Sequence, residues 1–484
     1  MKKNFLTAAA IMVVAFFVST EIAKAADISF SGQIRTRWEV NEQGNNGGNG
    51  AGTANSFANN PDDFIFSSVR LAAKANVNDT TSAYIQMQST RTWGQQAGAQ
   101  TGGANGGSGN ASGQVNDGDA SVGVHQAYFT LKNFLNLPIA LDAKVGRQEI
   151  LLDGWRLFGN TIWTPGMQTH DGITFSHKHD NMSLLLGYLL ATENTRTDDP
   201  NDRTDRDVYM GHFNYKGVLG GQFSAYFVYD QNTSGAGTGQ TRDNEVVTIG
   251  GRQAGNLAGL DYRVEYYHQL GSGNGQNDAQ FEGADVDRSA YMFGVRVGKT
   301  FKNVSFKPGL TVWYDYLSGT SDKDQRDGDW SSFSTVFDTG HKYYGLIDVF
   351  LGVGGGGNTG TQGLGLQDFA LKGKINPMPG WTLKADYHWF WTAEGVAANT
   401  GTRGFANATA AGQAPLGNSL GNELDITAVN KFNANTKVII GYSNYNPSQA
   451  FSQLKDGGVP AGSGGTLFGT QDANWGYVQF DVKF

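Results

Sequence analysis

The sequence has no cysteine, only 10 prolines in 484 residues and, beyond its N-terminal region, no long apolar run. The lack of cysteine excludes disulfide bonds, thiol catalysis and cysteine metal sites. The lack of a long apolar run excludes a transmembrane helix in the mature chain. Basic residues are also outnumbered, and the net charge of −8 argues against nucleic acid as a partner, because nucleic-acid binding requires a basic surface.

Glycine and aromatic residues, by contrast, are abundant, with 68 glycines and 12% Phe, Tyr and Trp. A chain that is polar on average, rich in aromatics and free of spanning helices has the composition of an outer-membrane β-barrel. A large secreted β-protein is the alternative that composition alone leaves open.

The N-terminus has the pattern of a secretory signal peptide. Lys2 and Lys3 precede an apolar run over residues 5–18, which is followed by "AKA" at residues 23–25. This run is shorter than the ~20 residues that a spanning helix needs, so we prefer a signal peptide to a membrane anchor. We expect residues 1–25 to be removed by cleavage near Ala25, which leaves residues 26–484 as one exported barrel domain.

Residues 28–40, "ISFSGQIRTRWEV", alternate between apolar and polar side chains. Successive side chains of a strand point to opposite sides, so Phe30 and Trp38 share one face while Arg35 and Arg37 share the other. The same period of two recurs along the chain and predicts eighteen strands in all. The other predicted strands are 64–77, 82–93, 122–132, 139–149, 169–178, 182–191, 206–216, 221–230, 244–254, 260–270, 288–301, 304–318, 362–375, 381–393, 419–433, 436–447 and 473–484.

The connections between these strands alternate between short and long. Residues 78–81 and 434–435 are tight turns, whereas 94–121, 319–361 and 448–472 are long segments. Bacterial transmembrane barrels have short periplasmic turns, long extracellular loops and an even number of strands, whereas a secreted β-protein has no reason to alternate. The sequence therefore predicts an all-β fold, an 18-stranded antiparallel transmembrane β-barrel in the bacterial outer membrane.

The C-terminus supports the same prediction. The last residues, "YVQFDVKF", form an amphipathic strand that ends on Phe484. This ending resembles the signal that the outer-membrane barrel-assembly machinery reads. We expect that machinery and outer-membrane lipid as partners.

The apolar face of each strand is predicted to meet lipid and the charged face to meet an aqueous lumen, because only a closed barrel pairs all strand backbone groups inside a bilayer. Tryptophans near strand ends are candidates for the interfacial aromatic girdles. They are Trp38, Trp313, Trp381, Trp389, Trp391 and Trp475.

The residues predicted to line the pore are Arg35, Arg37, Arg70, Lys74, Arg263, Glu265, Arg296, Asp315, Lys384, Asp386, Glu423 and Asp425. Rings of arginine and lysine in such a pore favour anions, and arginine offers a planar fork that matches a carboxylate.

No catalytic arrangement, metal site or cofactor site is predicted. Ser176 and His177 are adjacent in a strand, so they point to opposite faces and cannot form a dyad for a barrel-embedded enzyme. The acidic segment "DKDQRDGD" at 322–329 lacks the spacing of a calcium loop and its closing Glu. A structural or electron-conduit barrel would require a wider barrel and a dedicated partner. The sequence shows neither.

Several longer motifs resemble the alginate-export family of outer-membrane barrels. They are "GRQEILLDGWRLFGNTIWTPGMQTHDGITF" (146–175), "FDTGHKYYGLIDVF" (337–350), "ADYHWFW" (385–391) and "GNELDITAVNKFN" (421–433). The resemblance implies an eighteen-stranded barrel with a strongly electropositive pore. It also implies that Arg147 and Arg156 are pore residues, with Asp171, Glu423 and Asp425 as partner acids. His341 and Lys342 would lie at the end of the longest loop, which could fold back toward the pore.

The leading hypothesis from residues and resemblance together is an outer-membrane channel for selective passage of an anionic solute or an alginate-like polysaccharide. Arginines would offer many weak sites, since a tight site would block flux. The alternative is a general or small-solute porin in which long loops constrict the pore.

Overall fold

The computed structural model describes residues 27–41, 62–93, 122–192, 205–232, 244–274, 285–350, 361, 363–396, 417–456 and 472–484. The expected signal peptide and most of the Gly/Asn-rich connections predicted at 41–63 and 94–121 lie outside these residues. Within the described ranges, no helix has the length and apolar character needed to cross a membrane.

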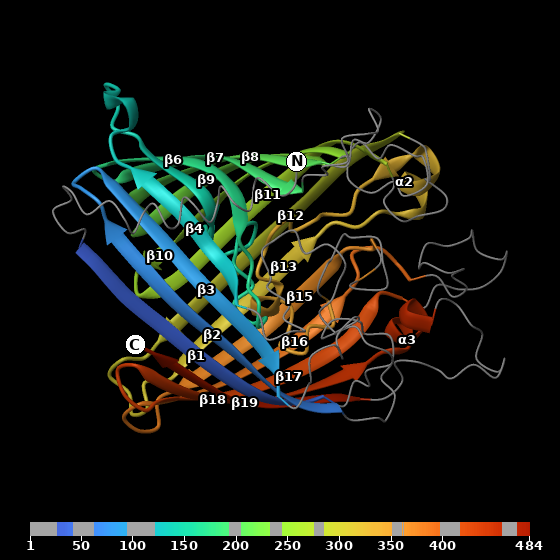
Figure 1. The fold of residues 1–484 in the computed structure, drawn as a ribbon. Helices are drawn as coiled ribbons and strands as arrows, with labels where there is room; N and C mark the ends of the chain where they lie inside the picture. Colours follow the sequence, from blue (N-terminus) through green and yellow to red (C-terminus); the bar gives the residue numbers. More distant parts are fainter. Residues whose placement is uncertain are drawn as a thin grey trace.

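The described residues form one sheet of nineteen strands that closes on itself, because β1 pairs with both β2 and β19. The two-residue strand β14 (Asp329–Trp330) pairs in parallel with β12 beside the wall. The remaining eighteen strands are antiparallel neighbours and make the barrel wall (Figure 1). They are β1 (Asp27–Asn41), β2 (Asp62–Asn76), β3 (Thr81–Thr92), β4 (Gly123–Leu131), β5 (Asp142–Gln148), β6 (His170–His179), β7 (Met182–Thr192), β8 (Arg206–Val218), β9 (Gly221–Asn232), β10 (Asn244–Leu257), β11 (Leu260–Asn274), β12 (Asp285–Thr300), β13 (Gly309–Leu317), β15 (Leu366–Ile375), β16 (Trp381–Trp391), β17 (Ser419–Lys431), β18 (Thr436–Pro447) and β19 (Ala473–Lys483).

The predicted fold class is confirmed, since each of the eighteen predicted strands corresponds to one strand of the wall. The largest difference is at β13, which begins at Gly309 and not at residue 304. The preceding connection is a wide turn in which Phe306 and Lys307 adopt left-handed backbone angles (φ 61° and 45°). The N–H of Phe301 bonds to the carbonyl of Pro308 across 2.8 Å and closes this turn.

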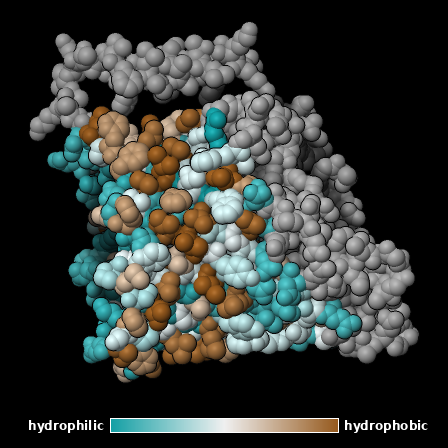
Figure 2. All heavy atoms as spheres, turned by 90° about the horizontal axis from the view of Figure 1, so that it is seen from below, coloured by the Kyte–Doolittle hydropathy of each residue, from teal (hydrophilic) through white to brown (hydrophobic). Residues whose placement is uncertain are grey.

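The two faces of the wall differ as predicted. On β1, Phe30 is 80% exposed, whereas Arg35 and Arg37 on the other face are 5% and 2% exposed. Figure 2 shows apolar residues spread over one side of the outer wall. Because side chains alternate along a strand, the charged face points into the barrel.

Aromatic residues lie on the outer face of the wall, but not all the tryptophans predicted to form the interfacial girdles are among them. Trp38 is 44% exposed on the outer face. Trp313 and Trp475 are only 8% and 4% exposed and point into the barrel, so their assignment to a girdle was wrong. Stacked tyrosines on neighbouring strands, such as Tyr291 with Tyr316 (ring centroids 5.7 Å apart), face outward instead.

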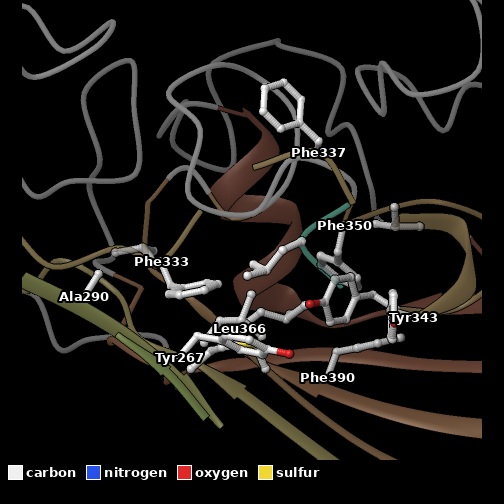
Figure 3. Close-up of a cluster of buried hydrophobic side chains, with 14 of the residues drawn as sticks. Tyr267, Ala290, Phe333, Phe337, Tyr343, Phe350, Leu366 and Phe390 are labelled. Carbon is white, nitrogen blue, oxygen red and sulfur yellow. The ribbon is translucent and has the colours of Figure 1, made fainter. Parts of the chain in front are cut away.

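Two connections enter the barrel and fill its middle. The first plug segment, residues 149–169, joins β5 to β6, and the second plug segment, residues 331–350, follows β14. The two meet at a parallel backbone bridge between Phe158 and Phe337, whose rings lie 5.4 Å apart. Figure 3 shows the resulting core, in which Phe350 packs 4.6 Å from the ring of Phe390 on β16. The short helices α2 (Asp322–Asp327), α3 (Gln449–Asp456), η1 (Phe134–Asn136) and η2 (Gly340–Lys342) lie in connections.

Candidate functional site

Arginines of β1 hold the first plug segment by its backbone. Arg35 donates to the carbonyl oxygen of Thr164 across 2.6 Å, and Arg37 donates to that of Trp163 across 3.0 Å. The guanidinium of Arg37 also lies 3.4 Å from the Trp163 ring centroid and forms a 2.6 Å ion pair with Glu39. Both arginines are buried under the plug, and their donors are used to fix it in place.

Arg70 of β2 has the same role. Its Nε donates to Gln88 on β3 across 2.7 Å, and its Nη2 contacts the sulfur of Met167 in the first plug segment. Gln88 in turn donates to the carbonyl oxygen of Gly166 across 2.6 Å. The structure therefore brings the predicted residues Arg35, Arg37 and Arg70 together at one plug contact.

Arg156 crosses the lumen from the first plug segment to the opposite wall. Its Nη2 lies 2.5 Å from Asp315 on β13 and 2.9 Å from Glu265 on β11. Its Nη1 donates to the hydroxyl of Tyr344 across 2.7 Å, and the guanidinium stacks 3.7 Å from the Tyr343 ring centroid. The arginine and both acids are almost completely buried, so this is an ion-paired centre held away from water.

Arg263 and Arg296 flank this centre and are less completely paired. Arg263 Nη2 lies 3.4 Å from Glu265, and Arg296 Nη2 lies 3.5 Å from Asp315. Arg296 also stacks on Trp313, 2.9 Å from the ring centroid. Both arginines are 9% exposed, yet their Nε atoms and the indole Nε1 of Trp313 find no hydrogen-bond acceptor among the described residues. Buried donors of this kind are costly unless water or a ligand accepts from them.

Further basic side chains lie around Arg263 and Arg296. Arg252 on β10 lies 3.8 Å from Asp153, Lys342 donates to the carbonyl of Gly154 across 3.1 Å, and Lys372 on β15 lies 3.0 Å from Asp386. We call the set the central basic cluster. It consists of Arg156, Arg252, Arg263, Arg296, Lys342 and Lys372 with the acids Asp153, Glu265, Asp315 and Asp386.

The plug residues of this cluster titrate abnormally. Burial, together with the charges of Arg263 and Arg156, lowers the pKa of Lys342 to about 8. Burial acts to raise the pKa of Asp153, but hydrogen bonds from His212 and Tyr226 outweigh it and hold the pKa below its usual range. At neutral pH Asp153 is therefore an anion and Lys342 a cation.

Glu423 and Asp425 do not pair with Arg147 or Arg156, which corrects the expected partnership. Glu423 accepts the backbone N–H groups of Leu346 (2.7 Å) and Ile347 (2.9 Å) and so holds the second plug segment. Asp425 accepts from Ser443 on β18 across 2.5 Å. Glu423 therefore supports the plug, whereas Asp425 bonds within the wall.

Arg147 and Asp171 do pair with each other, but on the outer face of the wall. Their bidentate contact measures 2.8 Å and 2.7 Å, and the side chains are 35% and 45% exposed. Gln148 and His170, which form the adjacent register pair, are the ones that point inward, at 1% and 4% exposure. We therefore exclude Arg147 and Asp171 from the lumen.

The remaining predicted residues, Lys74 and Lys384, occupy inward-facing positions near strand ends. Sequence reasoning missed Asp153, Gly154 and the packing role of the first plug segment. A signal was available, because residues 149–169 lack the period of two but include Leu152, Leu157 and Phe158, which a solvated loop would not need.

Comparison with known proteins agrees with the fold. The model of a family described as alginate export matches residues 26–457. A comparison with curated protein sequences finds no match. Among solved structures, the chain is similar to OccAB1 of Acinetobacter baumannii, with 12% identity over 96% of this chain and 99% of that chain and a TM-score of 0.54.

Two structures from Pseudomonas aeruginosa give similar values. OccK9 (OpdG) is 10% identical, covers 95% of this chain and 98% of that chain, and has a TM-score of 0.53. OccK8 (OprE) is 10% identical over the same shares, with a TM-score of 0.52. At these identities the likeness supports the barrel fold alone. The family match over nearly the whole chain confirms the resemblance seen in the sequence, so this protein is an outer-membrane channel that belongs to the alginate export family.

Proposed function

We propose that this channel selects anions, either small anionic solutes or an anionic polysaccharide, by means of the central basic cluster. The observation that supports the proposal is the set of buried N–H donors on Arg263, Arg296 and Trp313 without acceptors among the described residues. A carboxylate can accept from such donors in the planar geometry that arginine favours.

The electrostatics of the cluster favour the same solutes. Its six basic side chains outnumber its four acids, even when Asp338 of the second plug segment, whose charge acts on Arg156, is counted as a fifth acid. Two unit charges 4 Å apart interact by about 4 kcal/mol at an effective dielectric constant of 20, enough to offset part of the desolvation of an entering anion. Because Glu265 and Asp315 compete for the same arginines, the anion is held weakly enough to leave.

The plug favours a small-solute porin as the second candidate. The two plug segments pack a hydrophobic core across the middle of the barrel, which leaves less room for a polymer than for a small anion. Both candidates share the cationic selection and differ in the size of what passes.

Single-channel current in a planar bilayer tests the proposal. Under a salt gradient, the reversal potential of the wild-type channel should show preference for anions, and Arg263→Ala with Arg296→Ala should reduce that preference. Arg147→Ala is the matched control, since it removes an arginine from the outer face. A cation-selective wild-type channel, or equal loss of selectivity in the control, would refute the proposal.

A further inference from the structure

A second basic feature lies at the end of the barrel where the connections are short. Short turns mark the periplasmic end of such barrels, and α2 and α3 lie at the opposite end (Figure 1). Near the short-turn end, six inward-facing positions on β15 to β19 and on β2 carry lysine, while β1 between β19 and β2 has Ser29 and Gln33 there. The six lysines, which we call the lysine arc, are Lys374 on β15, Lys384 on β16, Lys431 on β17, Lys437 on β18, Lys483 on β19 and Lys74 on β2.

Two pairs within the arc place like charges directly opposite each other. Lys374 is the register partner of Lys384, and Lys431 is the partner of Lys437. Directly opposed residues have Cβ atoms about 5 Å apart, and like charges at that separation destabilise the sheet. The wall thus carries a repulsion that contributes nothing to its own stability, which is a feature expected of a functional surface.

Two acids lie near the arc on the inner face. Asp386 forms its 3.0 Å ion pair with Lys372, outside the arc. Asp481 is the register partner of Lys437 but accepts a 2.7 Å hydrogen bond from Gln33. Within the described part of the chain, no lysine of the arc forms an ion pair, and all six side chains are exposed.

We propose that the lysine arc is a periplasmic docking surface for a linear polyanion, which it holds below the central basic cluster. The inference rests on the proposed function in one respect only, namely that the cluster above then receives the anion. The arc explains from which side of the membrane a polyanion engages the channel.

The shape of the arc favours a chain over a folded acidic protein. Its lysines point inward from a concave wall, and eighteen strands about 4.8 Å apart, tilted by roughly 40°, close into a barrel about 35 Å across. The barrel axis therefore lies within about two Debye lengths of the wall at physiological salt. An extended polymer can enter this space and meet several lysines at once, whereas a globular domain would rest on the rim.

The test is block of single-channel current by polygalacturonate added to either side of the same channel. The wild-type channel should be blocked from one side only. In a variant with Lys374→Gln, Lys384→Gln, Lys431→Gln and Lys437→Gln, the blocking concentration on that side should rise at least tenfold. Because these changes remove like-charge repulsion, misfolding of the variant is not expected, and its thermal stability should equal or exceed that of the wild type.

The control is Lys299→Gln with Lys302→Gln, which removes two positive charges at the same end of the barrel but outside the lumen. This control should keep the one-sided block. Equal block from both sides, or unchanged block in the arc variant, overturns the inference. An anion-selective channel with symmetric block would leave the proposed function intact, whereas one-sided block through the arc in a channel without anion selectivity would refute the proposed function alone.

Discussion

Two groups of arginines lie inside this barrel and behave differently. At the contact between β1, β2 and the first plug segment, Arg35 and Arg37 donate to backbone carbonyls, and Arg37 is neutralised by Glu39. In the central basic cluster, Arg263 and Arg296 share acids with Arg156 and keep donors free of acceptors in the described structure. Arginine thus anchors the plug in one region and is a candidate for ion selectivity in the other. Charge inside a barrel therefore does not by itself identify a selectivity site.

The largest effect is expected at Arg156, which belongs to the first plug segment and pairs with the acids that Arg263 and Arg296 share. Arg156→Ala leaves Glu265 and Asp315 buried without their main cation, and breaking a buried ion pair in this way costs about 3–5 kcal/mol. We expect a lower unfolding temperature and faster proteolysis of the first plug segment. Arg156→Lys, which keeps the charge but loses the fork, should fall between wild type and Ala; stability equal to wild type in the Ala variant would contradict this account.

Arg37→Ala should loosen the plug without changing which ions pass. The substitution removes a charge-assisted hydrogen bond to the Trp163 carbonyl, worth about 1.5–3 kcal/mol, together with the stacking on Trp163 and the buried ion pair with Glu39. Single-channel conductance should rise, or flicker between levels, while the reversal potential stays the same. A change of selectivity without a change of conductance would show that Arg37 belongs with the second group.

Arg263→Gln should change the ion selectivity and leave the conductance nearly unchanged, which is the opposite of the result expected for Arg37→Ala. Its guanidinium shares Glu265 on the wall with Arg156 and packs against the plug at Gly154 and at the Tyr343 ring, 5.9 Å from the centroid, so we expect only a small shift of the plug. The reversal potential should shift toward zero with little change in conductance or unfolding temperature. Paired with Arg37→Ala, this variant separates the two roles; similar phenotypes in both would remove the distinction.

The sequence predicted the wall well because strand geometry is local. A period of two puts Arg35 and Phe30 on opposite faces whatever the rest of the chain does. The same rule could have corrected two errors, since Trp313 has the parity of Asp315, and Arg147 has the parity opposite to Lys144. The tryptophan was assigned from its place near a strand end and the arginine from family resemblance, and in both cases strand parity was the better guide.

The cluster itself could not be predicted from the sequence. Arg156 and Asp315 are 159 positions apart, and their contact depends on a plug segment that has no periodic pattern. Which acid pairs with which arginine follows from how that segment packs across the lumen. For this reason Glu423 and Asp425 were expected beside arginines, although Glu423 binds the backbone of the second plug segment.

The smallest effect is expected for Lys342, which lies in the second plug segment and contributes its charge to the central basic cluster. Its pKa of about 8 means that its contribution to anion selectivity is present at neutral pH and is lost as the pH rises through about 8, while the arginines stay charged. We expect the reversal potential of the wild-type channel to move toward zero between pH 7 and pH 9. Lys342→Gln and Lys342→Arg should both weaken that dependence, leaving the part due to Asp338, whose pKa burial raises to about 7. The same pH dependence in Lys342→Gln would assign the titration to another group and leave Lys342, like Arg37, as a residue that holds the plug.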